Sequence, residues 1–147
     1  MPKSPLRPSR RRSVKLAWHS HATRAIKLAL KYDFDVVYHC EYADEETLDQ
    51  LEAKKDKVFV APTIGSPWAY TYEAEPWGIT KEIAERNGML ERACDAYRKK
   101  RKRGLRALSG GDYGFAWNPI GNNARPRTFR QAFRLPARGS VARCEQI

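Results

Sequence analysis

Residues 14–64, VKLAWHSHATRAIKLALKYDFDVVYHCEYADEETLDQLEAKKDKVFVAPTI, decide the fold of this chain, because strand and helix patterns alternate along them. At residues 14–18 apolar side chains alternate with polar or small ones, a period of two that predicts a strand. A stripe with helical spacing follows at residues 22–30, and the apolar run at residues 34–39 predicts a second strand. Strand, helix, strand is the unit from which parallel sheets are built.

The alternation continues beyond this point. Residues 44–55 predict a helix with acidic residues in its first turn and lysines at its end, as the helix macrodipole favours. Residues 58–64 predict a third strand. Residues 65–78 are rich in aromatic residues and contain two prolines, so we expect an irregular loop there that acts as a lid.

One more helix and one more strand complete the pattern. Thr80 is the expected N-cap of a longer helix, weakened by Gly88 and ending in the basic run at residues 98–103, which we interpret as solvated last turns. Residues 105–112, LRALSGGD, predict a fourth strand whose Gly-Gly pair permits a close backbone approach. Four such strands predict an α/β fold with a parallel sheet, and periodicity leaves open whether that sheet closes into a barrel.

The charge of the chain is unevenly distributed. Its 147 residues carry a formal net charge of +11, of which residues 1–12 carry +5, residues 125–147 carry +5 and residues 13–124 only +1. We therefore expect one domain at residues 13–124, between a basic N-terminal tail and an Arg-rich C-terminal tail outside the fold. The tails are either genuine basic arms or out-of-frame translation around a gene fragment; we favour the second hypothesis, which sequencing of the surrounding DNA tests.

Composition also bears on the cellular compartment. The chain has no apolar run of the roughly 18 residues that a membrane span needs, and no apolar stretch follows its basic start. Cys40, Cys94 and Cys144 form no C-x-x-C pair, so neither a disulfide framework nor a cysteine-rich zinc site is predicted. We expect a reduced, cytoplasmic protein with no membrane partner.

Reactive side chains fall at the predicted strand ends. His19, with His21 on the same side, closes the first strand, His39 closes the second and Asp112 the fourth. Neighbouring parallel strands lie about 5 Å apart, so His19 and His39 could converge on one metal ion. A single histidine is more often an ordinary surface or core residue, and Asp112 has an equally simple interpretation as a turn or N-cap residue. All three histidines of the chain lie at strand ends, however, which favours a site.

These residues carry a resemblance to a known family. The stretch at residues 14–63, together with LRALSGGDYGFAW at residues 105–117, resembles strand–helix units five to eight of metal-dependent amidohydrolases of the imidazolonepropionase-like group. Their usual motifs read V-A-x-H-A-H-G, I-E-H-G, D-E-E-T-L and V-P-T. The resemblance covers residues 13–124 and implies a partial (βα)8 TIM barrel. It also implies hydrolysis of amide-type C–N bonds in small molecules with one or two divalent ions, commonly zinc.

The resemblance assigns roles as well. It implies that His19, His39 and Asp112 are metal ligands and that Asp112 is also the catalytic acid and base. His21 and Tyr113 become candidates for substrate binding. The H-x-H motif of the first strand and the bridging lysine of the fourth strand are missing, and a full barrel needs about 250 residues. We therefore expect a truncated fragment without activity of its own, which pairs with a missing barrel half or self-associates.

Two further hypotheses stay open. The basic tails would suit a nucleic-acid-binding protein without sequence preference, whose affinity falls steeply with salt. The chain shows no helix-turn-helix, zinc-finger or RNA-binding signature to support this alternative. A third hypothesis is a non-catalytic α/β domain that pairs with the missing half. The sequence does not define the substrate, the metal or the oligomeric state.

Overall fold

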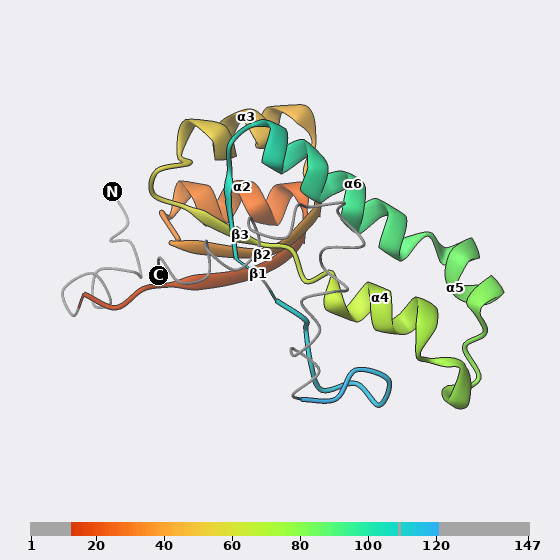
Figure 1. Ribbon diagram of the computed structural model, residues 1–147. Helices are drawn as coiled ribbons and strands as arrows, with labels where there is room; N and C mark the ends of the chain where they lie inside the picture. The colour runs from red at the N-terminus through yellow and green to blue at the C-terminus, as the bar shows by residue number, and fades with distance from the viewer. Residues whose placement is uncertain (1–12, 109, 121–147) are drawn as a thin grey trace, which may run out of the picture.

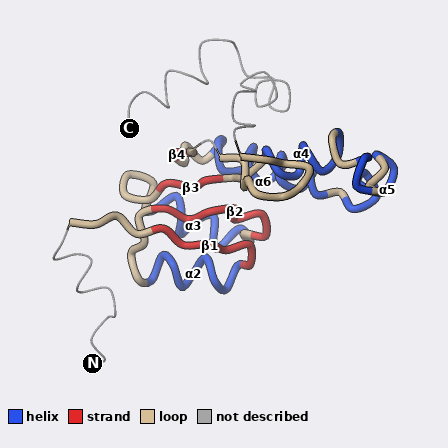
Figure 2. Tube along the Cα trace, turned by 90° about the horizontal axis from the view of Figure 1, so that it is seen from below, coloured by secondary structure: helices blue, strands red, loops and turns tan. Residues whose placement is uncertain are grey.

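Four parallel strands form the sheet of this protein, whose computed structural model describes residues 13–108 and 110–120. The strands lie side by side in chain order, and each neighbouring pair is parallel. They are β1 (Ala17–Ala22), β2 (Val36–Tyr42), β3 (Phe59–Ala61) and β4 (Arg106–Ala107). Figure 1 shows the sheet with its helices, and Figure 2 shows β1, β2 and β3 side by side. The predicted α/β fold with a parallel sheet is confirmed.

Helices α2 (Thr23–Lys31) and α3 (Glu45–Ala53) connect the first three strands and lie on one face of the sheet (Figure 1). The predicted apolar stripe of α2 is the side that it buries. Asp44 caps α3 as an oxygen acceptor for the Thr47 backbone N–H at 2.8 Å. The main core lies between these helices and the sheet, and its buried members are Ile26, Ala29, Leu30, Val37, Cys40, Leu48, Leu51, Val58, Val60 and Leu105.

The prediction of an irregular loop at residues 65–78 is wrong. Helix α4 (Gly65–Tyr72) and the short 3-10 helix η1 (Glu75–Trp77) occupy most of it. Pro67 lies in the first turn of α4, where no intrahelical N–H is needed, so this proline permits the helix. The helix buries one face, and the Thr71 hydroxyl donates to the Pro67 carbonyl oxygen at 2.8 Å.

The long helix predicted after Thr80 is divided in two. Thr80 is the N-cap, as expected, because its hydroxyl accepts from the Ile83 backbone N–H at 3.3 Å. Helix α5 (Lys81–Asn87) then ends at Gly88, which has a φ of +60°, and α6 (Met89–Lys102) begins after it. A left-handed residue cannot continue a right-handed helix, and glycine adopts that conformation at little cost.

The basic run at residues 98–103 is not wholly solvated, contrary to the sequence-based interpretation. Lys100 is only 1% exposed, and its ammonium group bonds to the backbone carbonyl oxygen of His39 in β2. Arg103 joins the end of α6 to the acidic face of α3 through ion pairs with Glu45, Asp49 and Glu52. Part of the run therefore fixes α6 against the rest of the domain.

Two strands also differ in length from the predictions. Strand β1 begins at Ala17 and continues to Ala22, and β4 is limited to Arg106–Ala107. Beyond β4, Leu108 donates one further backbone hydrogen bond to the carbonyl oxygen of Val60 at 2.8 Å. The Cα of Gly111 then lies so close to Gly65 that a side chain on Gly65 would collide with it. The Gly-Gly pair thus permits a close backbone approach to Gly65 at the start of α4.

The face of the sheet opposite α2 and α3 carries the exposed side chains of β1. Ser20 is buried and Trp18 half-buried toward the helices, whereas Ala17, His19 and His21 are exposed on the other side. In a closed (βα)8 barrel this second face is the interior. None of the described helices is both long and apolar enough to cross a membrane. The basic tails and the predicted domain boundary at residue 124 lie outside the described residues.

Candidate metal centre

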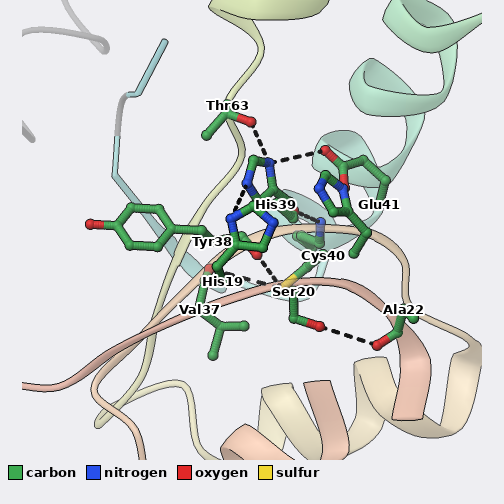
Figure 3. Close-up of polar contacts among 11 residues, drawn as sticks. His19, Ser20, Ala22, Val37, Tyr38, His39, Cys40, Glu41 and Thr63 are labelled. Atoms are coloured by element: carbon green, nitrogen blue, oxygen red, sulfur yellow. Dashed lines mark hydrogen bonds and ion pairs between the residues drawn. The ribbon is translucent and has the colours of Figure 1, made fainter. Parts of the chain in front are cut away.

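The side chains of His19 and His39 meet within the sheet: β1 (Ala17–Ala22) and β2 (Val36–Tyr42) each continue three residues beyond their histidine, so the prediction that these histidines close their strands is wrong. Strands β1 and β2 pair in register with His19 opposite Tyr38 and Ser20 opposite His39. This register brings His19 Nδ1 to 3.2 Å from His39 Nε2 (Figure 3). The proximity of these two histidines, expected from the spacing of parallel strands, is confirmed.

A backbone irregularity in β2 orients His39. The register of β1 and β2 shifts after Ser20, and His39 and Cys40 have φ values of 65° and 62°. Such left-handed residues are uncommon outside glycine and typical of bulges. Consequently the His39 ring faces His19 while Cys40 packs in the main core. The backbone carbonyl of His39 accepts a hydrogen bond from Lys100 Nζ at 3.1 Å.

His39 is 3% exposed, and contacts on its Nδ1 side hold its ring in place. Its Nδ1 lies 2.6 Å from the hydroxyl of Thr63, just beyond β3, and 3.7 Å from Glu41 Oε1 (Figure 3). Burial lowers the pKa of His39 below its ordinary value of 6.5, and the charges of His21 and His19 act in the same direction against those of Glu41 and Asp112. A neutral imidazole with Nδ1–H donating to Thr63 directs the lone pair of Nε2 toward His19.

His21 completes a cluster of three imidazoles. Its ring stacks on that of His39 with centroids 4.0 Å apart, and its Nδ1–H donates to Glu41 Oε2 at 2.8 Å. The ligand atoms of His19, His21 and His39 all lie within 4.8 Å of one another. Imidazole nitrogens suit zinc and related divalent ions, so the chemistry of this donor set fits a metal.

Asp112 lies beside this cluster but outside it. The side chain is exposed, and its backbone has a φ of 52°. Its charge only partly opposes the lowering of the His39 pKa, which burial dominates. Buried Asn118 fixes the local backbone, because its Nδ2 donates to the carbonyl oxygens of Gly111 at 2.7 Å and Asp112 at 3.0 Å. Among the described residues the structure thus brings the three histidines together and leaves the Asp112 carboxylate out of that set.

Tyr113 follows Asp112 and packs on the backbone of Gly111, where a side chain would collide with its ring. Burial raises the pKa of Tyr113. Farther along, Trp117 stacks on Phe115 and meets the edge of Tyr70 in α4. Trp117, Phe115 and Tyr70 therefore pack against one another.

Sequence reasoning missed the side chains that surround the histidines. Glu41 follows His39 by two residues, as His21 follows His19, so a search for polar residues of equal offset on paired strands would have found it. Thr63 is the last polar residue of the third predicted strand, at residues 58–64, and could have been found in the same way. Lys100 lies 61 residues from its partner His39 and gives no local signal.

Comparison with known proteins supports this description of the fold. The chain is similar to the crystal structure of an amidohydrolase, with 19% identity, a TM-score of 0.59 and coverage of 75% of this chain and 26% of that one. A Xaa-Pro dipeptidase with bound methionine in its active site shows 22% identity, a TM-score of 0.53 and coverages of 71% and 26%. The ochratoxinase of A. niger shows 23% identity and a TM-score of 0.55, with coverage of 71% of this chain and 23% of that one.

These structures establish the class of fold. The chain spans about a quarter of their length. No protein-family model matches the sequence, and no curated protein matches it. The likeness to the solved structures confirms, at the level of the fold, the predicted resemblance to amidohydrolases over only part of their length.

Proposed function

We propose that this chain is the part of a metal-dependent amidohydrolase that comprises strand–helix units five to eight of its (βα)8 barrel. Its substrates are small molecules with amide or cyclic amide C–N bonds. Residues 13–124 form this part, and the tails on either side do not contribute to it. The fold neighbours include an amidohydrolase and a Xaa-Pro dipeptidase, which supports the reaction class.

The observation that carries the proposal is the pairing of His19 and His39. Two imidazole nitrogens lie 3.2 Å apart on adjacent parallel strands, in the carboxyl-terminal half of each, and (βα)8 enzymes hold their reactive groups toward the carboxyl ends of the strands. Thr63 fixes the orientation of the His39 ring, and burial lowers the pKa of that ring, which favours the neutral form that metal ligation requires.

In this proposal His19 and His39 hold a divalent ion, most simply zinc, and Asp112, on the adjacent loop, is the general acid and base. The ion supplies Lewis acidity toward the scissile carbonyl and lowers the pKa of water. Asp112 accepts the proton of the attacking water through its exposed carboxylate and returns it to the leaving amine. Asn118 positions that loop through its two backbone bonds.

The remaining residues of the proposal serve substrate binding and assembly. Tyr113, next to Asp112, contacts the substrate. We expect no turnover from these 147 residues by themselves, because they contribute only three histidines and the chain spans a quarter of the neighbouring structures. The other barrel half, with its H-x-H motif, completes the centre.

The test is amide hydrolysis by the chain co-expressed with the first four strand–helix units of an amidohydrolase barrel and supplied with zinc. N-acyl amino acids and Xaa-Pro dipeptides form the substrate panel. We expect hydrolysis by the pair, none by the chain alone, and a loss of at least 100-fold for His39→Ala or Asp112→Asn. Glu82→Gln, an exposed carboxylate on α5, is the matched control. Equal rates for the wild-type pair and the His39→Ala pair would refute the assignment.

A further inference from the structure

His21 lies in the same cluster as the two proposed metal ligands. It follows His19 by two residues on β1, so that both side chains project from the same face of the sheet. Its ring centroid lies 5.1 Å from that of His19 and 4.0 Å from that of His39. Each ring offers one nitrogen, and these three nitrogens lie no more than 4.8 Å from one another.

The Glu41 carboxylate stands behind His21. Its Oε2 accepts from His21 Nδ1–H at 2.8 Å, and its Oε1 lies 3.7 Å from His39 Nδ1. The side chain of Glu41 is only 14% exposed, so the carboxylate is held in place rather than sampling solvent. A carboxylate on the far nitrogen of a metal-binding histidine fixes the ring and its tautomer, and makes the near nitrogen more basic. In His21 the near nitrogen is Nε2.

The spacing of the other two rings suits a small tetrahedral ion. Two nitrogens bound to one zinc at about 2.05 Å in tetrahedral geometry lie about 3.3 Å apart. His19 Nδ1 and His39 Nε2 are 3.2 Å apart. Three imidazoles and one open position form a familiar catalytic zinc set, and such a set needs no carboxylate ligand.

We propose that His21 is the third ligand of a three-histidine divalent-metal site and that Glu41 is the carboxylate that positions it. Asp112 is then not a ligand. All three rings and Glu41 come from β1 and β2, which are adjacent hydrogen-bonded strands, so this chain binds the metal without the other barrel half. The inference rests on the metal site of the proposed function but not on its hydrolase activity.

The test is titration of the whole chain with Co²⁺, followed by visible absorption, and competition with Zn²⁺. We expect one Co²⁺ per chain with the absorption of a four-coordinate nitrogen site. His21→Gln should weaken Co²⁺ binding at least 10-fold, and Glu41→Gln 10- to 100-fold. Asp112→Asn is the matched carboxylate control and should change the affinity less than twofold. His21 has a 47% exposed side chain, so its replacement leaves the fold intact, as circular dichroism will verify.

A second measurement separates positioning from simple structural support. The ¹⁵N chemical shifts of the His21 ring should report the Nδ1–H tautomer in the wild type and a mixture of tautomers in Glu41→Gln, without metal. Unchanged Co²⁺ affinity in His21→Gln, or an equal loss in Asp112→Asn, overturns the inference while leaving the proposed function standing. A wild-type chain that binds no Co²⁺ refutes the self-sufficient site. Metal binding without hydrolysis by the assembled pair refutes only the proposed function.

Discussion

Lys100 Nζ, buried in α6, donates a hydrogen bond to the backbone carbonyl oxygen of His39 at 3.1 Å. This bond crosses from the helix layer to the strand that presents the histidine, at the point where His39 and Cys40 adopt left-handed backbone conformations. Burial lowers the pKa of Lys100 from its usual 10.5, so the ammonium group is held there against a desolvation cost. One lysine of the basic run therefore supports the site directly.

We predict that Lys100→Met destabilises the chain by about 1–3 kcal/mol, because the His39 carbonyl loses its donor in a buried place. Removing the buried ammonium charge also removes its desolvation cost, which stabilises the variant. We therefore expect a loss of unfolding free energy near the lower end of that range. Urea denaturation measures the free energy of unfolding. Lys99→Met, one residue earlier and exposed, should change it by less than about 0.5 kcal/mol. Similar losses in both variants would contradict the role of Lys100.

Thr63→Val should weaken metal binding by about 10-fold, because the hydroxyl that fixes the His39 ring at 2.6 Å is removed while the side-chain shape is kept. Calorimetric titration with Zn²⁺ measures the affinity. Thr71→Val is the matched control, since it also removes a buried hydroxyl that bonds 2.8 Å away, to the Pro67 carbonyl in α4. An equal loss of affinity in the two variants would show a general effect of destabilisation.

The cap of α3 predicts a pH dependence. Hydrogen bonds from Thr47 lower the pKa of Asp44 below its usual 3.8. Because the pKa is lower in the folded state, the carboxylate contributes its stabilisation above pH 3.8, and that contribution disappears as the pH falls through the folded pKa. Asp44→Asn retains a cap that does not titrate. The Tm advantage of the wild type over Asp44→Asn should therefore shrink between pH 7 and pH 3. A constant difference in thermal unfolding would disprove this.

We predict self-association through the uncovered sheet face and the free edges of β1 and β4 in the described part of the chain. Tyr38 in β2 is 40% exposed on this face. Size-exclusion chromatography at micromolar concentration should show species larger than a monomer. Tyr38→Lys should shift the population toward the monomer, whereas Tyr32→Lys, at the equally exposed Tyr32 beyond α2, should not. A clean monomeric peak for the wild type would count against this prediction.

The sequence predicted the βα order because its signals are local. The stripe at residues 22–30 has helical spacing and became the buried side of α2, and the acidic turn after Asp44 became the start of α3. Signals that depend on context were weaker. The prolines at residues 65–78 favoured a loop, although Pro67 is harmless in the first turn of a helix that buries one face.

The sequence by itself determined the parallel strands, the helices between the first three and the placement of His19 and His39 on neighbouring strands. Periods of 2 and 3.6 residues and the short βαβ connections suffice for that. Only the tertiary structure decided which groups surround the histidines. Thr63 and Lys100 reach His39 from residues 24 and 61 positions away, and the left-handed backbone at His39 turns its ring toward His19. Such contacts follow from packing between distant segments, which no local pattern encodes.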